Sequence, residues 1–129
     1  MATWQQVREL LQKEYPIKED KGEFLMINFK ISETRTQIVG VNKRESSGAG
    51  DWVEIMSPIG DVPPVLLDKV LAKAYEMVFG GIVKCSDLHF LRDTLPLEDL
   101  TPDRLVQTLH AIVGKADSIE KECLGTDKF

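Results

Sequence analysis

The densest group of side chains that could do chemistry in this sequence is Cys85, Asp87 and His89. In an unbroken strand the three would project from one face, where they could ligate a metal ion or activate the thiol. A tight turn is expected near Asp87, however, and a turn would scatter the three side chains. The other histidine, His110, adjoins the apolar face of a predicted helix, where a hydrogen-bonded boundary residue is expected. We therefore interpret Cys85 and both histidines as structural residues.

The remaining polar residues lack the spacing of a metal, redox or phosphate site. Cys85 and Cys123 lie far apart, and neither belongs to a C-x-x-C pair, so reduced thiols are predicted. No spacing typical of an EF-hand or of a phosphate-binding loop occurs. Four acidic residues surround the predicted start of the last helix, where the helix dipole favours negative charge: Asp93, Glu98, Asp99 and Asp103. The sequence therefore predicts a protein that is not an enzyme, with no cofactor and no metal.

The composition is that of one globular domain. The 129 residues are 43% hydrophobic and 29% charged, which is enough to bury one core without disulfides or metals. The formal charge is −5 and the basic residues are scattered, which argues against a nucleic-acid partner. No apolar run approaches about eighteen residues and residues 1–6 carry no basic leader, so neither a membrane span nor a secretory signal is expected. We assign a cytoplasmic domain to residues 1–125 and a flexible tail to residues 126–129.

Three helices are predicted from apolar spacing and from capping residues. The first, over residues 3–15, begins with a capping box between Thr3 and Gln6 and ends before a proline. The second, over residues 63–79, opens on two prolines and stops at two glycines. The third, over residues 101–123, opens on a Thr-Pro pair and keeps apolar residues at steps of three and four.

Five strands are predicted from alternating apolar residues: Phe24–Ile31, Thr36–Arg44, Trp52–Ile59, Ile82–Asp87 and His89–Leu97. The connections within each group of strands are short, and short connections favour antiparallel pairing because parallel strands need long crossovers. The predicted fold is α+β, with an antiparallel five-stranded sheet and three helices in the order α-β-β-β-α-β-β-α.

Two short sequence motifs resemble those of a known protein family. Residues 56–60 read Met-Ser-Pro-Ile-Gly and precede a leucine-rich helix. Residues 95–97 read Leu-Pro-Leu, with Leu100 leading into the last helix, which carries Ala116. These motifs, together with the order of the predicted helices and strands, resemble the YbjN-like bacterial family and its type III secretion chaperone-like fold. The resemblance implies a small homodimer that binds polypeptide and does no catalysis.

Apolar side chains remain once one face of the sheet is assigned to the core. Phe24, Met26, Ile38, Trp52 and Met56 alternate with the core residues and so point to the other face. The second helix could cover them, or a symmetric partner or an extended client peptide could do so. The residues that we predict to bind a client are Trp4, Phe24, Met26, Trp52 and Met56. The residues that we predict at a dimer interface are Leu67, Leu71 and Tyr75.

Two functions follow from these patterns. The leading hypothesis is a non-enzymatic, homodimeric, protein-binding or chaperone-like module with a polypeptide client. The acidic balance of the chain predicts clients whose flanking residues are neutral or basic. The alternative is a regulatory domain that senses a small molecule in a pocket beneath the second helix.

Overall fold

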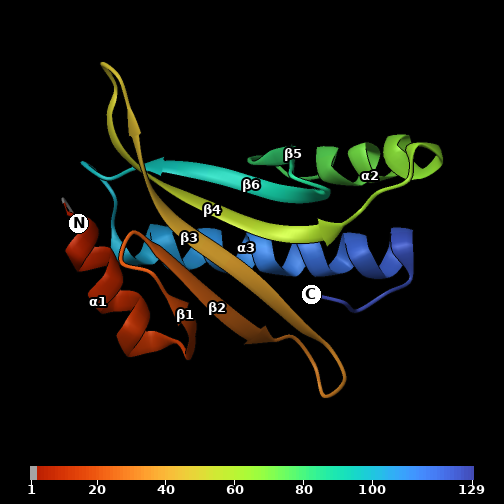
Figure 1. The fold of residues 1–129 in the computed structure, drawn as a ribbon, viewed down its shortest axis with the longest axis horizontal. Helices are drawn as coiled ribbons and strands as arrows, with labels where there is room; N and C mark the ends of the chain where they lie inside the picture. The colour runs from red at the N-terminus through yellow and green to blue at the C-terminus, as the bar shows by residue number, and fades with distance from the viewer. Residues whose placement is uncertain (1–2) are drawn as a thin grey trace.

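The fold is an open, six-stranded antiparallel sheet with helices packed on one side (Figure 1). The computed structural model describes residues 3–129. The strands are β1 (Ile17–Asp20), β2 (Phe24–Lys30), β3 (Thr36–Ser46), β4 (Gly50–Gly60), β5 (Gly81–Cys85) and β6 (Leu88–Pro96). The helices are α1 (Trp4–Glu14), α2 (Pro64–Tyr75) and α3 (Pro102–Ile119), which continues into the π-helical turn η1 (Glu120–Leu124). The strand order is β1-β2-β3-β4-β6-β5.

The hydrophobic core lies between the sheet and α3. This helix contacts β3, β4 and β6, and Figure 1 shows it running behind β3 and β4. The α3 residues Leu105, Leu109 and Ile112 are fully buried against the alternate strand residues, for example Val41 and Ile55. Helix α1 adds its buried residues to the same core. The spacing of three and four that predicted these helices is therefore the spacing of the core face.

Helix starts follow the capping residues that the sequence predicts. The Thr3 side chain accepts a hydrogen bond from the Gln6 backbone N–H at 3.2 Å, and the Gln6 side chain accepts one from the Thr3 backbone N–H. The Thr101 hydroxyl accepts a hydrogen bond from the Arg104 backbone N–H, also at 3.2 Å. Both caps satisfy N–H groups that have no partner within the helix.

The predicted α+β class, three helices and antiparallel sheet are confirmed, but five strands is wrong because the sheet has six. Strand β1 occupies Ile17–Asp20 and pairs with β2 at the edge of the sheet. Its sequence, Ile-Lys-Glu-Asp, holds one apolar residue and three charged ones, so no alternation of apolar residues marks it. Charged residues suit an edge strand, which has one unpaired side.

Helix α2 packs beside α3 and leaves the opposite face of the sheet open. Its contacts are with α3, β5 and η1, and its fully buried residue is Val70. Lys73 pairs with Glu122 of η1 at 2.7 Å, and Lys115 of α3 pairs with Glu76 at 3.0 Å. The hydrogen bond from Lys115 holds the pKa of Glu76 below its usual range. The possibility that α2 covers the second face of the sheet is therefore wrong.

Helix α1 is fixed to the β1–β2 turn by a bidentate ion pair. Two guanidinium nitrogens of Arg8 contact the two carboxylate oxygens of Asp20 at 2.7 and 2.8 Å, and Arg8 also donates to the Gly22 carbonyl at 2.7 Å. Trp4 Nε1 donates to the same carbonyl at 2.9 Å. The hydrogen bond from Arg8 and the one from the Gly22 N–H hold the pKa of Asp20 well below its usual range.

We expect Asp20→Asn to reduce the acid sensitivity of folding. A carboxyl group whose pKa is lowered by folding stabilises the protein above its unfolded pKa of about 4, and this contribution is lost as the pH falls. The difference in unfolding free energy between the wild type and the variant should therefore be largest at neutral pH and should shrink by about pH 3. Urea unfolding at both pH values measures it.

The matched control is Glu19→Gln. Glu19 lies on the same strand and pairs with Lys21, and both side chains of this ion pair are exposed. This variant should have nearly the same unfolding free energy as the wild type at both pH values. An Asp20→Asn effect that does not change with pH would contradict the assignment of the lowered pKa to the folded state.

Candidate functional site: the outer face of the sheet

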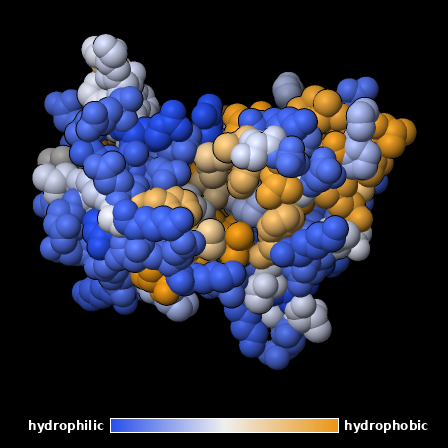
Figure 2. All heavy atoms as spheres, in the orientation of Figure 1, coloured by the Kyte–Doolittle hydropathy of each residue, from blue (hydrophilic) through white to orange (hydrophobic). Residues whose placement is uncertain are grey.

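The face of the sheet opposite α3, called the outer face, carries an apolar hollow. Its volume is about 350 Å³, and we name it the outer hollow. Its walls come from β2, β3, β4, β5 and β6 and from Phe129, and they include Phe24, Met26, Ile38, Met56, Cys85, Leu88 and Phe90. Figure 2 shows apolar side chains gathered at the centre of this face, where the surface is hollowed, with hydrophilic side chains around them. No α2 residue lines it.

Strand register brings these residues together from separate parts of the sequence. Met26 lies opposite Gly40 on β3, and Gly40 lies opposite Met56 on β4. Because Gly40 has no side chain, the ring of Phe24 lies over this position: an added Cβ would be 2.8 Å from Phe24 Cε2. The glycine therefore sets the depth of the hollow and the position of the Phe24 ring.

An arginine-lined cleft adjoins the outer hollow toward the β3–β4 hairpin. The Glu54 side chain is only 3% exposed, and its Oε2 pairs with Nη1 of Arg44 at 3.0 Å and with Nη1 of Arg92 at 3.3 Å. Trp52 lines the same cleft, and its Nε1 donates to the Ala49 carbonyl at 3.0 Å. Glu45 also lines the cleft, so its two guanidinium groups are balanced by two carboxylates.

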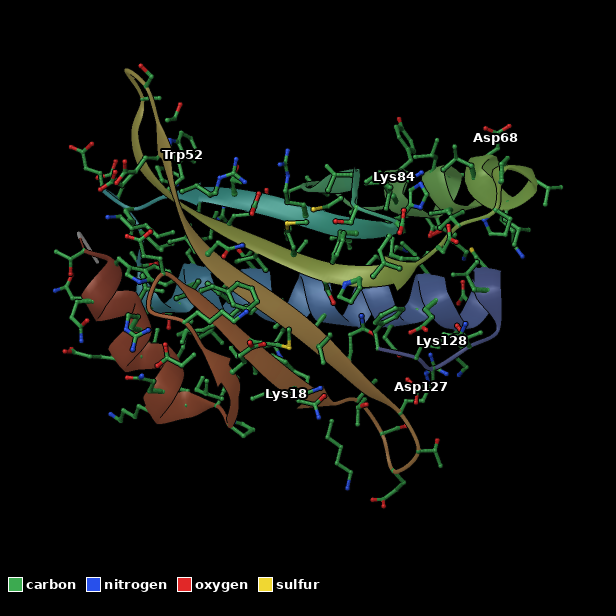
Figure 3. All side chains as sticks on the ribbon, in the orientation of Figure 1. Lys18, Trp52, Asp68, Lys84, Asp127 and Lys128 are labelled. Carbon is green, nitrogen blue, oxygen red and sulfur yellow. The ribbon has the colours of Figure 1, made fainter. Side chains whose placement is uncertain are left out.

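Residues 126–129 lie at the other end of the outer face. Figure 3 shows Lys128 there, far from Trp52 near the hairpin. The Ile38 N–H donates to the Phe129 carbonyl at 3.0 Å, and Phe129 also lines the outer hollow. Flexibility of residues 126–129 stays a prediction, and the structure adds specific contacts between this segment and the sheet.

A second apolar surface lies on α2 and on the turn that follows it. We name it the α2 patch, formed by Leu71, Tyr75 and Val78. Tyr75 is 89% exposed and Val78 is 99% exposed. Such high exposure is unusual for apolar side chains that lie next to one another on a protein surface. Apolar side chains also appear on this side of the molecule in Figure 2.

The structure groups some of the predicted binding residues and separates others. Phe24, Met26 and Met56 line the outer hollow together, whereas Trp52 lies in the neighbouring cleft. Trp4 is on α1, where its ring packs against the core and its Nε1 bonds to the β1–β2 turn. Trp4 therefore does not belong to the outer hollow.

The predicted dimer residues also divide. Leu71 and Tyr75 lie in the α2 patch, but Leu67 packs partly into the hydrophobic core. Sequence reasoning missed Phe90 and Phe129. Phe90 alternates with buried neighbours in a predicted strand, so this alternation is a signal that could have found it, whereas nothing in the sequence marks Phe129.

The chemistry-bearing residues are scattered, as the predicted turn requires. Cys85 is exposed and lines the outer hollow together with Leu88, which lies opposite it on β6, while His89 is buried on the other face. The His89 Nδ1 accepts a hydrogen bond from the Val62 N–H at 3.3 Å. His110 contacts the Tyr15 hydroxyl at 3.2 Å from a helix surface. These placements separate the thiol from both imidazoles.

The acidic residues near the start of α3 lie in different environments. Asp103 lies in the first turn of α3, as the capping interpretation predicts, whereas Asp93 lies on β6. Burial raises the pKa of Asp93, and a hydrogen bond from the Thr94 backbone and the nearby charge of Arg104 act in the opposite direction.

Within residues 3–129, one group of carboxylates is close enough to hold a metal ion: Asp117, Glu120 and Asp127, whose oxygens lie within 4.8 Å of one another. A cation is already present there, because Arg35 Nε donates to Asp117 at 3.0 Å. Arg35 also donates to the Thr126 carbonyl at 2.8 Å. The group therefore ties residues 126–129 to the body of the protein.

Comparison with known proteins adds no assignment: no protein-family model matches the chain, and no curated protein matches it significantly. Among the described residues, no helix is long and apolar enough to cross a membrane.

We expect His89→Ala to lower the free energy of unfolding by about 1–3 kcal/mol, because the buried Val62 N–H loses its acceptor. Cys85→Ser should leave it unchanged, because Cys85 is exposed. Thermal or urea unfolding measures both effects, and elemental analysis of the purified protein checks for metal. Stoichiometric zinc or iron that is lost in either variant would contradict the structural role and favour a chemical one.

Proposed function

We propose that this protein is a non-enzymatic, homodimeric module that binds an extended polypeptide segment of a client protein on its outer face. The observation that carries the proposal is the outer hollow, an apolar surface in the middle of a sheet that none of the described helices covers. Extended peptides are commonly held by apolar pockets and by free main-chain groups of a sheet. Met26 and Met56 suit such a site, because methionine side chains adapt to different partners.

The α2 patch supports dimer formation. Large side chains such as Tyr75 and Val78 would be removed from water if the same patch of a second copy covered them, and a two-fold pair is the commonest way to do so. The patch lies on α2 and the turn after it, whereas the outer hollow is formed by strands β2 to β6 and by Phe129. A dimer of this kind would therefore leave both outer hollows available.

The resemblance to the YbjN-like family and to the type III secretion chaperone-like fold supports the same proposal. That family implies a homodimer that binds polypeptide, and the order of the three helices agrees with the resemblance. The additional edge strand β1 departs from it. The free thiols of Cys85 and Cys123 are compatible with the proposed cytoplasmic location.

The charges of the arginine-lined cleft do not change the proposed client preference. Arg44 and Arg92 share Glu54, and Glu45 lines the same cleft, so the charged groups balance. We propose that an apolar residue of the client occupies the hollow and that the flanking residues are neutral or basic, as the net charge of the chain favours.

A small-molecule sensor is the second candidate, because a hollow of about 350 Å³ has the size of a small-ligand pocket. A second hollow of about 320 Å³, lined by Leu66 of α2 together with Leu124 and Phe129, could also hold a small ligand. The peptide remains the leading proposal because the Phe129 main chain already accepts a hydrogen bond from the Ile38 N–H of β3 beside the outer hollow.

We expect sedimentation at micromolar concentration to give twice the mass of the chain. Tyr75→Glu and Leu71→Glu should each convert the dimer to a monomer, because a charge would be buried at the centre of the interface. Ile31→Glu is the matched control, since Ile31 is also an exposed apolar residue but lies outside the α2 patch. Circular dichroism separates dissociation from unfolding, and a wild type that stays monomeric at high concentration would contradict the proposed dimer.

We expect Met56→Glu to weaken binding to immobilised short peptides by at least about 1–2 kcal/mol, as for a buried anchor at an interface. Trp52→Ala should have a smaller effect, because Trp52 lies in the adjoining cleft. Asn28→Glu places the same charge on an exposed position of β2 outside the hollow and should bind as the wild type does. Equal losses for Met56→Glu and Asn28→Glu would mean that the hollow is not the binding site.

A further inference from the structure

We propose that Phe129 makes, within the same chain, the contacts that an aromatic residue of an extended client makes at the rim of the outer hollow, so that client and tail compete for the Ile38 N–H. This inference rests on the proposed function and adds a regulatory segment to it. Its basis is a gap in the pairing of β3 with β4, a main-chain contact that fills the gap, and an aromatic ring beside it.

Pro58 creates the gap. Strand β4 pairs with β3 as far as Gly40 and Met56. Continued in this register, Val39 would face Ser57 and Ile38 would face Pro58. Proline has no N–H group and so cannot donate to the Ile38 carbonyl. The Ser57 hydroxyl donates to that carbonyl instead, at 2.6 Å. The Pro58 carbonyl, in turn, accepts from the Gln37 side chain at 2.7 Å.

These substitutions leave the Ile38 N–H without a partner on β4. The Phe129 carbonyl accepts from it at 3.0 Å, which is the contact that an added strand would make. Phe129 also lines the outer hollow with Phe24 and Met56. The site therefore recognises two things at once, a main-chain carbonyl and an apolar side chain of the same residue, and these define an extended polypeptide with an aromatic residue.

The rest of the tail is held separately from the hollow. Glu120 Oε2 accepts from the Thr126 hydroxyl and from the Lys128 N–H, each at 2.8 Å. Arg35 donates to the Thr126 carbonyl. These contacts keep the tail close to the site when Phe129 leaves it. Exchange of Phe129 for a client residue thus gives up one main-chain hydrogen bond and the contacts of the ring with the two hollows that it lines. The tethered ring competes at a high effective concentration.

The test uses a fluorescein-labelled synthetic peptide with the sequence of residues 120–129, added to the intact protein. We expect Phe129→Ala to bind the peptide about fivefold to tenfold more tightly than the wild type, because the competing ring is removed. Fluorescence anisotropy measures the dissociation constants. Lys128→Ala is the matched control, since it keeps the backbone N–H that donates a hydrogen bond to Glu120. This variant should bind the peptide as the wild type does.

Two further variants locate the binding. A peptide in which alanine replaces the phenylalanine should not bind, and Met56→Glu introduced into the Phe129→Ala protein should abolish binding. Equal affinities of the wild type and Phe129→Ala for the labelled peptide would overturn the competition.

The outcomes also separate this inference from the proposed function. If immobilised peptides bind the wild type and are lost in Met56→Glu, while Phe129→Ala changes nothing, the outer hollow is the binding site and the tail does not compete. If Phe129→Ala gains affinity for the labelled peptide but immobilised peptides of other sequence never bind, the competition stands and the hollow serves only the chain's own tail.

Discussion

The strands of this sheet carry apolar side chains on both faces, and the helices cover one face only. On the covered face, α3 and α1 bury residues such as Ile27 and Ile55 completely. On the outer face, their sequence neighbours Met26 and Met56 are only partly buried and line a hollow. Burial of the core face stabilises the fold, whereas the outer face offers apolar area that a partner can remove from water. The proposed function depends on this asymmetry.

Small features of β3 and β4 turn the open face into a defined site. Gly40 makes room for the Phe24 ring, and Pro58 ends the hydrogen-bond ladder between the two strands. The first feature shapes an apolar cavity, and the second frees a main-chain donor at Ile38 beside it. A peptide that binds here can therefore be selected by its side chain and held by its backbone, which is how sheet surfaces usually recognise extended segments.

Local signals explain which parts of the fold could be predicted from the sequence. The caps at Thr3 and Thr101 and the alternation in β2 and β4 concern neighbouring residues, so one sequence is sufficient to find them. Strand β1 was missed because its stability comes from pairing with β2 rather than from its own apolar residues. The end of α2 at Tyr75, short of the two glycines, likewise has no strong local signal.

The candidate site shows the same difference between local signals and long-range contacts. Phe24, Met26 and Met56 could be assigned to one face because a strand alternates strictly. The tail could not be placed, because Arg35 and Thr126 are separated by 91 residues and their contact follows from the packing of the whole domain. That Trp4 binds a client stays a prediction; its distance from the outer hollow could not be predicted, because an amphipathic helix does not reveal which part of the molecule its aromatic residue meets.

Methionine methyl NMR tests the central claim, that the outer hollow and the α2 patch are separate surfaces with separate partners. Met26 and Met56 line the outer hollow, and Met77 lies in the surface hollow beside the α2 patch. In protein labelled with ¹³C at the methionine methyl groups, dilution should shift the Met77 signal, and a bound peptide should shift those of Met26 and Met56. A peptide that shifts Met77 and leaves Met26 and Met56 unchanged would contradict the account.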